Sequence, residues 1–236
     1  MFGLHNIPFE FKKDDISLSF YNDAGGYHYE RDCKGDLASR TIISNKKLGI
    51  LLNPVEPVNT PKAITDKFQI EFNEPYMVGP KITKKIYLRY PMEIGVFIGA
   101  GKDFEKIDIF SLVPQKFTMY GEHRLGHLCR HWKSEVLDKI PATDPLYEGV
   151  MELTISNITG SWVDITKVVF NACGMTEHYS KDLVSMKARM NILQPHLAIT
   201  EFINEPIRKG MKKSMELYTP GTVTLFEPKF TMAGLR

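Results

Sequence analysis

The strongest constraint on the fold of this chain is a strict two-residue alternation near its middle. In the run from Glu148 to Ser156, every second side chain is apolar, namely Met151, Leu153 and Ile155. Successive side chains of a β-strand point to opposite faces, so this pattern predicts a strand with one buried face. A turn-like segment, 157–161, precedes a second strand-like run from Trp162 to Phe170. The segment therefore predicts a β-hairpin.

The second run of this predicted hairpin breaks its own pattern. Val163 and Ile165 share a face, but Lys167 falls on that same face before Val169. A charged side chain on a buried face indicates one of two features. Either a β-bulge shifts the register at this point, or the Lys167 side chain reaches past the edge of the sheet.

The same alternation recurs along most of the chain. Clear examples are Ile16 to Phe20, Phe68 to Phe72, Ile86 to Tyr90 and Val184 to Ile192. About a dozen short strands at spacings of roughly 8–12 residues are typical of sandwiches and barrels, whereas helical periodicity is nearly absent. We therefore expect an all-β protein with antiparallel β-sandwich architecture, in two packed sandwich-like halves with very little helix.

Two proline-rich stretches are candidate linkers. Residues 53–61 contain three prolines, and residues 138–145 contain two more just before the last 90 or so residues. The C-terminal part carries enough strand patterns for a small sandwich of about 100 residues. We expect β-sandwich-like domains at 1–141 and 146–236; the alternative is one large sandwich spanning 1–236.

Composition excludes several classes of protein. Hydrophobic residues make up 43% and charged residues 25% of the chain, which is ordinary globular usage. The net charge of +2 gives no strong signal for nucleic-acid binding. The longest apolar stretch, Ile94 to Gly101, is less than half of what a membrane-spanning helix needs. The three cysteines are odd in number and widely separated, and no signal peptide is evident, so we expect free thiols and a cytoplasmic protein.

The densest group of metal-ligand residue types lies between His123 and His131. It contains His123, His127, Cys129 and His131, and His and Cys are common ligands of zinc. On a strand, His127 and His131 would lie about 13 Å apart at their backbones, too far to share one ion. His123, His127 and Cys129 are the remaining candidate set, with a fourth ligand from elsewhere, such as His28 or His178. We favour a strand face without metal, and keep a zinc site as the alternative.

Other chemical motifs are weaker. The sequence contains no nucleophile elbow, no zinc-protease motif and no phosphate-binding loop of the Walker type. Four aromatic residues would suit stacking on sugars, although large aromatics at strand starts are more typical of a core: Tyr27, Tyr29, Trp132 and Trp162. No residue is assigned to catalysis or to a cofactor.

Several stretches together resemble a known family over nearly the whole chain. They are Leu52 to Pro57, Ile86 to Val96, Trp132 to Val136, and Leu146 to Val150 with its continuation to Asn171. The family is an uncharacterised archaeal domain of unknown function. The resemblance implies a β-rich fold and an archaeal source, and it implies no activity, cofactor or catalytic residue.

We therefore expect a non-enzymatic β-sandwich protein with an interaction or ligand-binding role, with a protein as one class of partner. The alternative is a metal-binding protein or metal-dependent enzyme that uses the His123 to His131 segment. A third hypothesis is a carbohydrate- or anion-binding module. Binding through loops or sheet edges needs no catalytic motif, which favours the first hypothesis. The sequence indicates neither a ligand nor an oligomeric state.

Overall fold

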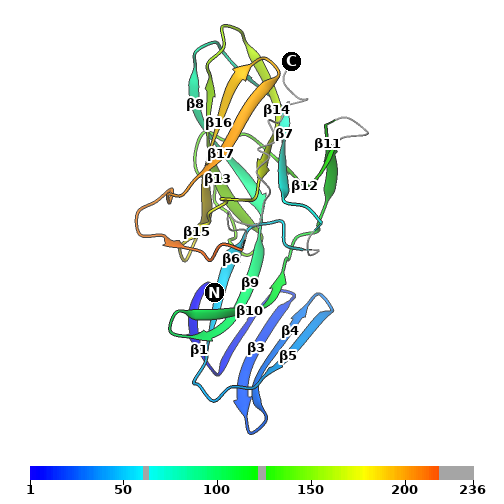
Figure 1. Cartoon of the computed structure of the whole chain (residues 1–236), viewed down its shortest axis with the longest axis vertical. Coiled ribbons are helices and arrows are strands. Elements are labelled where there is room, and N and C mark those ends of the chain that lie inside the picture. The colour runs from blue at the N-terminus through cyan, green and yellow to red at the C-terminus, as the bar shows by residue number, and fades with distance from the viewer. Residues whose placement is uncertain (61–63, 122–125, 218–236) are drawn as a thin grey trace.

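A computed structural model describes residues 1–60, 64–121 and 126–217 of the chain. These residues form 18 strands in four sheets, and they contain no helix. The all-β prediction is therefore confirmed. The sheets pack in pairs as two sandwiches stacked along the long axis of the molecule (Figure 1).

The lower sandwich in Figure 1 consists of two four-stranded sheets. The first has the order β1-β6-β9-β10 and the second the order β2-β3-β4-β5. Their bounds are β1 (Gly3–Asn6), β6 (Gly49–Val55), β9 (Glu93–Ala100), β10 (Asp103–Phe110), β2 (Phe9–Lys13), β3 (Ile16–Asp23), β4 (Gly26–Cys33) and β5 (Asp36–Ile42). Their inward side chains share one core, which includes Leu18, Tyr29, Leu52 and Val96.

The upper sandwich also has two sheets. One has the order β11-β12-β7-β14, and the other has the order β18-β15-β16-β13-β8, with β17 beside β16. Their bounds are β11 (Phe117–Tyr120), β12 (His127–Ser134), β7 (Lys67–Val78), β14 (Val163–Asn171), β18 (Lys212–Lys213), β15 (His178–Tyr179), β16 (Val184–Gln194), β13 (Glu148–Asn157), β8 (Thr83–Pro91) and β17 (Leu197–Ile203). Pairing is antiparallel except for two parallel pairs, β12 with β7 and β13 with β16.

The predicted hairpin over residues 148–170 is wrong in its pairing, although both of its strands exist. β13 pairs with β8 and β16, whereas β14 pairs with β7 in the opposite sheet. The turn between them carries the chain across the sandwich. Met151 of β13 and Ile165 of β14 thus meet across one core. Alternation identifies a strand with one buried face, but it does not identify the neighbouring strand.

The irregularity predicted at Lys167 is a β-bulge. The register of β14 against β7 shifts between Ile165, which pairs with Tyr76, and Lys167, which pairs with Glu71, so that β7 holds the extra residues across the break. Lys167 then pairs with Glu71 of β7, and its ammonium group lies 5.6 Å from the centre of the Tyr120 ring. The bulge thus keeps the charged side chain out of the core.

The two sandwiches are interleaved along the chain. Strands β7, β8, β11 and β12 precede residue 141 and share the upper sandwich with β13 to β18. The single residue Met92 separates β8 in the upper sandwich from β9 in the lower one. The division into domains at 1–141 and 146–236 stays a prediction, which limited proteolysis near Pro141 would test.

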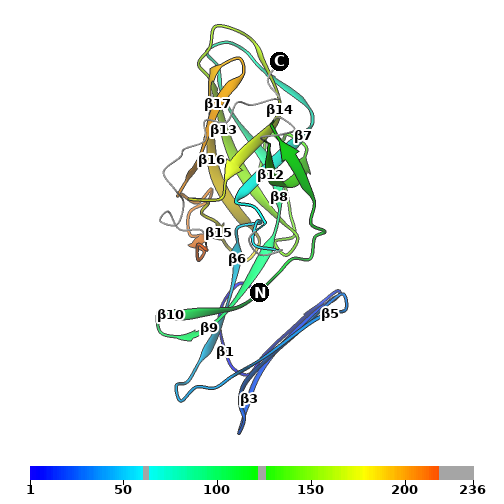
Figure 2. The same ribbon diagram turned by 45° about the vertical axis from the view of Figure 1, so that its right-hand side comes forward.

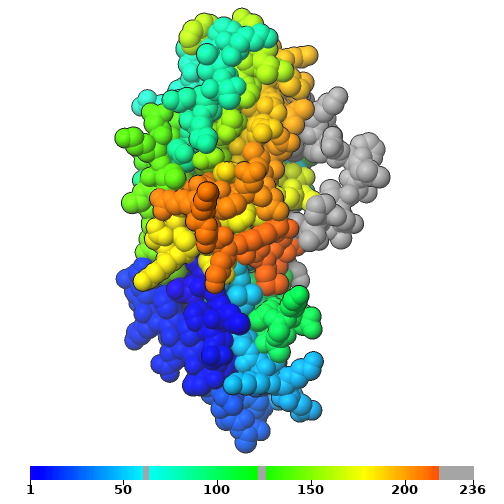
Figure 3. All heavy atoms as spheres, turned by 90° about the vertical axis from the view of Figure 1, so that its left-hand side faces the viewer, coloured from blue at the N-terminus to red at the C-terminus, as the bar shows by residue number. Residues whose placement is uncertain are grey.

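A polar junction connects the two sandwiches. Orange and yellow atoms of the C-terminal strands meet the blue N-terminal residues directly in Figure 3. The hydroxyl of Ser214 donates to the Asn53 side chain and to the Pro54 carbonyl, and the Leu217 amide donates to Glu56 Oε1 at 2.8 Å. The end of the described chain is thereby fastened to the segment that leaves β6.

Candidate functional site

A shallow hollow of about 390 Å³ lies on the sheet formed by β2 to β5. It is lined by Ser17, Ser19, Glu30, Arg31, Asp32, Leu37, Ala38 and Ser39. Ser17 and Ser19 flank Leu18, whose side chain is buried in the core. Because side chains alternate along a strand, the serine side chains point away from the core. The hollow therefore lies on the outer face of this sheet.

Strand register arranges the outer side chains in polar rows. Ser19 of β3 is paired with Glu30 of β4, and Glu30 with Ser39 of β5. The next row along the strands consists of Tyr21, His28 and Thr41. Rows on one face are spaced by two residues, or roughly 7 Å. Carboxylate, hydroxyl and aromatic groups from three strands thus share one surface.

Glu30 is held in place within these rows. Its Oε1 accepts a hydrogen bond from the Tyr21 hydroxyl at 3.0 Å, and its Oε2 accepts a longer one from Ser19 at 3.5 Å. The hydrogen bond to Glu30 raises the pKa of Tyr21, which keeps the phenol protonated. The Tyr21 ring stacks on His28, with ring centres 4.9 Å apart and planes 23° apart. Glu30 and the ring pair are therefore ordered together.

His28 extends this network to the end of the β3–β4 hairpin. Its Nε2 lies 3.0 Å from Asp23 Oδ1, and its Nδ1 lies 3.3 Å from the Thr41 hydroxyl. The contact with His28 and the hydrogen bond donated by the Gly25 amide lower the pKa of Asp23. A second hollow of about 310 Å³ adjoins this end, lined by residues 22–27 and 43–45. The candidate site is the polar strip between the two hollows, hereafter the outer-face strip.

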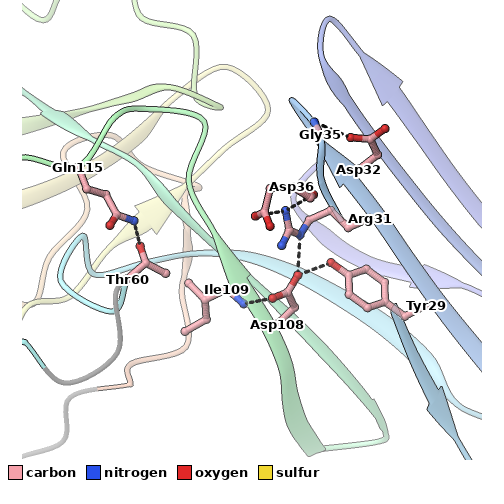
Figure 4. A network of polar contacts seen from close by, with 9 residues as sticks. All are labelled: Tyr29, Arg31, Asp32, Gly35, Asp36, Thr60, Asp108, Ile109 and Gln115. Carbon is pink, nitrogen blue, oxygen red and sulfur yellow. Dashed lines mark hydrogen bonds and ion pairs between the residues drawn. The ribbon is translucent and has the colours of Figure 1, made fainter. Parts of the chain in front are cut away.

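A buried network fixes the sheet that carries this strip (Figure 4). Asp108 of β10 accepts hydrogen bonds from the Tyr29 hydroxyl at 2.6 Å and from Arg31 Nε at 2.7 Å. Arg31 also contacts the Asp36 carboxylate at 2.9 Å, and its guanidinium lies 5.1 Å from the centre of the Phe110 ring. Burial, followed by the neighbouring Asp108, raises the pKa of Tyr29. The network joins β4 to β10 across the core, so we assign it a structural role.

The residues singled out for the predicted metal site differ in their surroundings. Cys129 is buried beside Tyr120 and Val169, and burial raises the pKa of its thiol to about 12. His127 is exposed on the same strand, and His131 Nε2 lies 3.1 Å from Glu71 Oε2. No group of three or more His, Cys, Asp or Glu within the described ranges is arranged to hold a metal ion. His123 lies outside those ranges, so the zinc alternative stays a prediction.

The aromatic residues singled out from the sequence are divided between core and surface. Tyr29 is buried in the lower core, Tyr27 packs beside it, and Trp132 packs against the upper core. Trp162 alone among the four is largely exposed. The aromatic member of the outer-face strip, Tyr21, was missed by sequence reasoning. The available signal was its alternation with Phe20, which places the Tyr21 side chain outward.

Buried acids also gather near the junction of the sandwiches. Glu93 accepts hydrogen bonds from the amides of Asn59 and Thr60 and from the Thr60 hydroxyl. Burial raises the pKa of Glu93 to about 7, against these hydrogen bonds and the attraction of Arg130. Glu177 is also fully buried, and its pKa is raised by burial and by the nearby carboxylates. The Glu93 carboxyl thus holds the segment around Asn59 and Thr60, and both raised pKa values make stability depend on pH.

Comparison with known proteins gives one family assignment. A search of curated proteins and a search of solved structures each found no match. No helix in the described ranges has the length and apolarity that crossing a bilayer requires. A family model described as a protein of unknown function (DUF432) matches residues 1–233, which is nearly the whole chain. The chain therefore belongs to the DUF432 family of proteins of unknown function.

Proposed function

We propose that this protein is a non-enzymatic ligand-binding protein, and that the outer-face strip binds a saccharide. The observation that carries the proposal is the pairing of the 390 Å³ hollow with the Glu30, Tyr21 and His28 network. The volume falls in the range of roughly 300–1,000 Å³ that is usual for small-molecule sites. The site belongs to a rigid sheet, so it is formed before a ligand arrives.

The side chains suit a ligand rich in hydroxyl groups. Carboxylates accept hydrogen bonds and hydroxyls both donate and accept them, so Glu30, Asp32, Ser17, Ser19 and Ser39 offer partners to several sugar hydroxyls. The stacked Tyr21 ring offers an apolar face for the carbon–hydrogen side of a sugar ring. Acidic groups outnumber basic ones along the strip, which disfavours a phosphate ligand.

No described group on the strip is activated for catalysis. The Glu30 and Asp23 carboxylates are engaged by neighbouring donors, and the phenol of Tyr21 is held protonated. A general acid would need a carboxyl whose pKa lies near the working pH, and that feature occurs here at the buried Glu93 of β9 instead. These observations support binding without reaction.

We further propose a cytoplasmic location, supported by three free cysteines, of which Cys33 and Cys129 are buried. An archaeal source is kept as an expectation from the family resemblance. The partner that we propose is a small saccharide and not a nucleic acid.

A saccharide screen followed by calorimetry tests the proposal. The wild-type protein is expected to bind at least one mono- or oligosaccharide. Replacing Glu30→Gln should weaken that binding about tenfold, because a hydrogen bond to a charged group is worth roughly 1.5–3 kcal/mol. Replacing Tyr21→Ala should weaken it to a similar degree. The matched control is Glu201→Gln, an exposed carboxylate on the upper sandwich. Equal binding by all four proteins would overturn the site, and absence of binding across the screen would overturn the ligand class.

A further inference from the structure

Three neighbouring turns form the end of the upper sandwich that lies farthest from the outer-face strip. They are the β7–β8 turn (residues 79–82), the β13–β14 turn (residues 158–162) and the β16–β17 turn together with the last two residues of β16 (residues 193–196). The first two are the teal and yellow-green loops at the top of Figure 1, and they are seen as atoms at the rounded top of Figure 3. Backbone hydrogen bonds join the turns: Asn157 N to Ile82 O at 2.9 Å and Ile158 N to Ile192 O at 3.2 Å.

This end, hereafter the apolar tip, exposes large hydrophobic side chains on the first two turns and at the end of β16 beside the third. The exposed fractions are 64% for Trp162, 51% for Ile158, 50% for Ile82 and 36% for Leu193. A Cβ placed on Gly79 would lie 3.3 Å from the Trp162 ring and 3.5 Å from Ile82, so both side chains lie over this glycine. Single exposed hydrophobics need no explanation, but a group on adjacent turns marks an interaction site.

The tip is held rigid by one buried amide. Asn157 Nδ2 donates to the carbonyls of Val78, Gly79 and Ser161 at 3.1, 3.0 and 2.8 Å. Its Oδ1 accepts from the Thr159 amide at 3.0 Å and from the Thr159 hydroxyl at 2.7 Å. All the hydrogen-bonding capacity of this side chain is thus used to fix two turns. The exposed apolar groups are therefore presented on a fixed scaffold.

The charge of the tip favours an anionic partner. None of the three turns contains an aspartate or a glutamate. Lys81 lies at the centre of its turn, and its ammonium group donates to the Ile158 carbonyl at 2.5 Å. No ion pair of Lys81 occurs within the part of the chain that the structure describes. The tip is therefore apolar with an uncompensated positive charge.

We propose that the apolar tip inserts into the interfacial region of an anionic lipid bilayer. A convex end with three short turns fits a deformable surface better than it fits a groove of fixed shape. Tryptophan is enriched at bilayer interfaces, because its ring is apolar and its N–H is polar. A lysine near an anionic surface is worth about 1 kcal/mol. In this arrangement only the apolar tip contacts the membrane, and the outer-face strip at the opposite end of the molecule stays accessible to solvent.

Flotation with lipid vesicles tests this inference. The full chain should float with vesicles that contain phosphatidylglycerol. Trp162→Ser should lower the partition coefficient, and hence the bound fraction. We expect a fall of about tenfold, because the free energy of moving such a side chain out of water corresponds to at least a tenfold change in binding. Lys81→Asn should reduce it about fivefold on anionic vesicles only; asparagine tolerates the φ of 59° at this position. The matched control is Leu4→Ser, an exposed leucine in β1 of the opposite sandwich, which should float like the wild type.

Tryptophan fluorescence distinguishes insertion from other kinds of contact. The chain has two tryptophans, so a Trp132→Phe variant leaves Trp162 as the only reporter. Insertion predicts a blue shift and quenching by lipids brominated on their acyl chains. Unquenched fluorescence at saturating lipid would overturn the proposal. Dimers of the wild type that Trp162→Ser converts to monomers, without vesicle binding, would also overturn it and would assign the tip to contact between copies of the chain.

Discussion

The buried Glu93 carboxyl should make the stability of this protein fall as the pH rises. Its pKa is about 7 in the folded chain, compared with 4.5 for an ordinary glutamate. Between these two values the folded state binds more protons than the unfolded state, so the free energy of unfolding decreases with rising pH. The stabilisation that comes from protonated Glu93 is fully present below about pH 4.5 and is lost progressively up to about pH 7. Above that pH, Glu93 causes no further change in the free energy of unfolding.

The difference between these pKa values corresponds to roughly 3 kcal/mol. A Glu93→Gln variant isolates it, because glutamine resembles the protonated acid in shape and keeps one acceptor oxygen for Thr60, while the hydrogen bond from the Asn59 amide is altered. At pH 4.5 the variant should be within about 1 kcal/mol of the wild type, the value of one altered hydrogen bond. At pH 7.5 the variant should have gained about 3 kcal/mol relative to the wild type. The negative charges of Glu93 and Glu177 repel each other. Removing the charge at Glu93 relieves this repulsion, which adds to the stability gained by the variant at high pH.

Urea unfolding at half-unit steps from pH 4.5 to pH 8, for both proteins, measures this difference. Titrations elsewhere in the chain cancel when the two free energies are subtracted. The control is Glu201→Gln, whose side chain is exposed and whose curve should run parallel to that of the wild type. Parallel curves for Glu93→Gln and the wild type would refute the assignment of a raised pKa to Glu93.

Four other substitutions have predictable effects on the free energy of unfolding, measured with urea unless stated otherwise. Gly149→Ala should cost about 2 kcal/mol, because a Cβ there would lie 2.3 Å from the fully buried Tyr90 ring; a cost below 0.5 kcal/mol would contradict this packing. Asp108→Asn should cost about 3 kcal/mol and Tyr29→Phe about 1 kcal/mol, since the first change breaks a largely buried ion pair and the second one hydrogen bond. A larger cost for Tyr29→Phe than for Asp108→Asn would contradict the assignment of Asp108 as the centre of this network. Asn157→Ala should cost about 2 kcal/mol and speed hydrogen exchange selectively in the two turns that it joins; unchanged exchange there would contradict its role.

Much of the local structure could be predicted from the sequence, because burial on one face leaves a period of two in the side chains. The run with Met151, Leu153 and Ile155 is a strand, and the misplaced Lys167 marks a β-bulge. Strand partners could not be predicted in this way. The turn after β13 leads to the opposite sheet, and nothing in its own residues distinguishes that crossing from a hairpin. Pairing depends on contacts between segments far apart in the chain, such as β8 with β13.

The candidate site was less predictable than the fold. Histidines and a cysteine near one another in sequence suggested chemistry, but along β12 their surroundings differ: Cys129 is buried in a small cluster, His127 is exposed and His131 contacts Glu71. Tyr21, His28 and Glu30 are unremarkable in sequence, and only the register of β3 with β4 brings them together. Trp162 was interpreted as a core aromatic because it precedes a strand, yet the adjacent Gly79 leaves room for the ring on the surface. Sites made by cross-strand neighbours carry no linear motif.

The most direct test of the central proposal is a map of amide chemical shifts for the labelled protein as a saccharide from the screen is added. Binding at the outer-face strip predicts perturbations concentrated in β3, β4 and β5 around Glu30, and their loss in Glu30→Gln. Perturbations confined to the upper sandwich, or an unchanged response in Glu30→Gln, would contradict it.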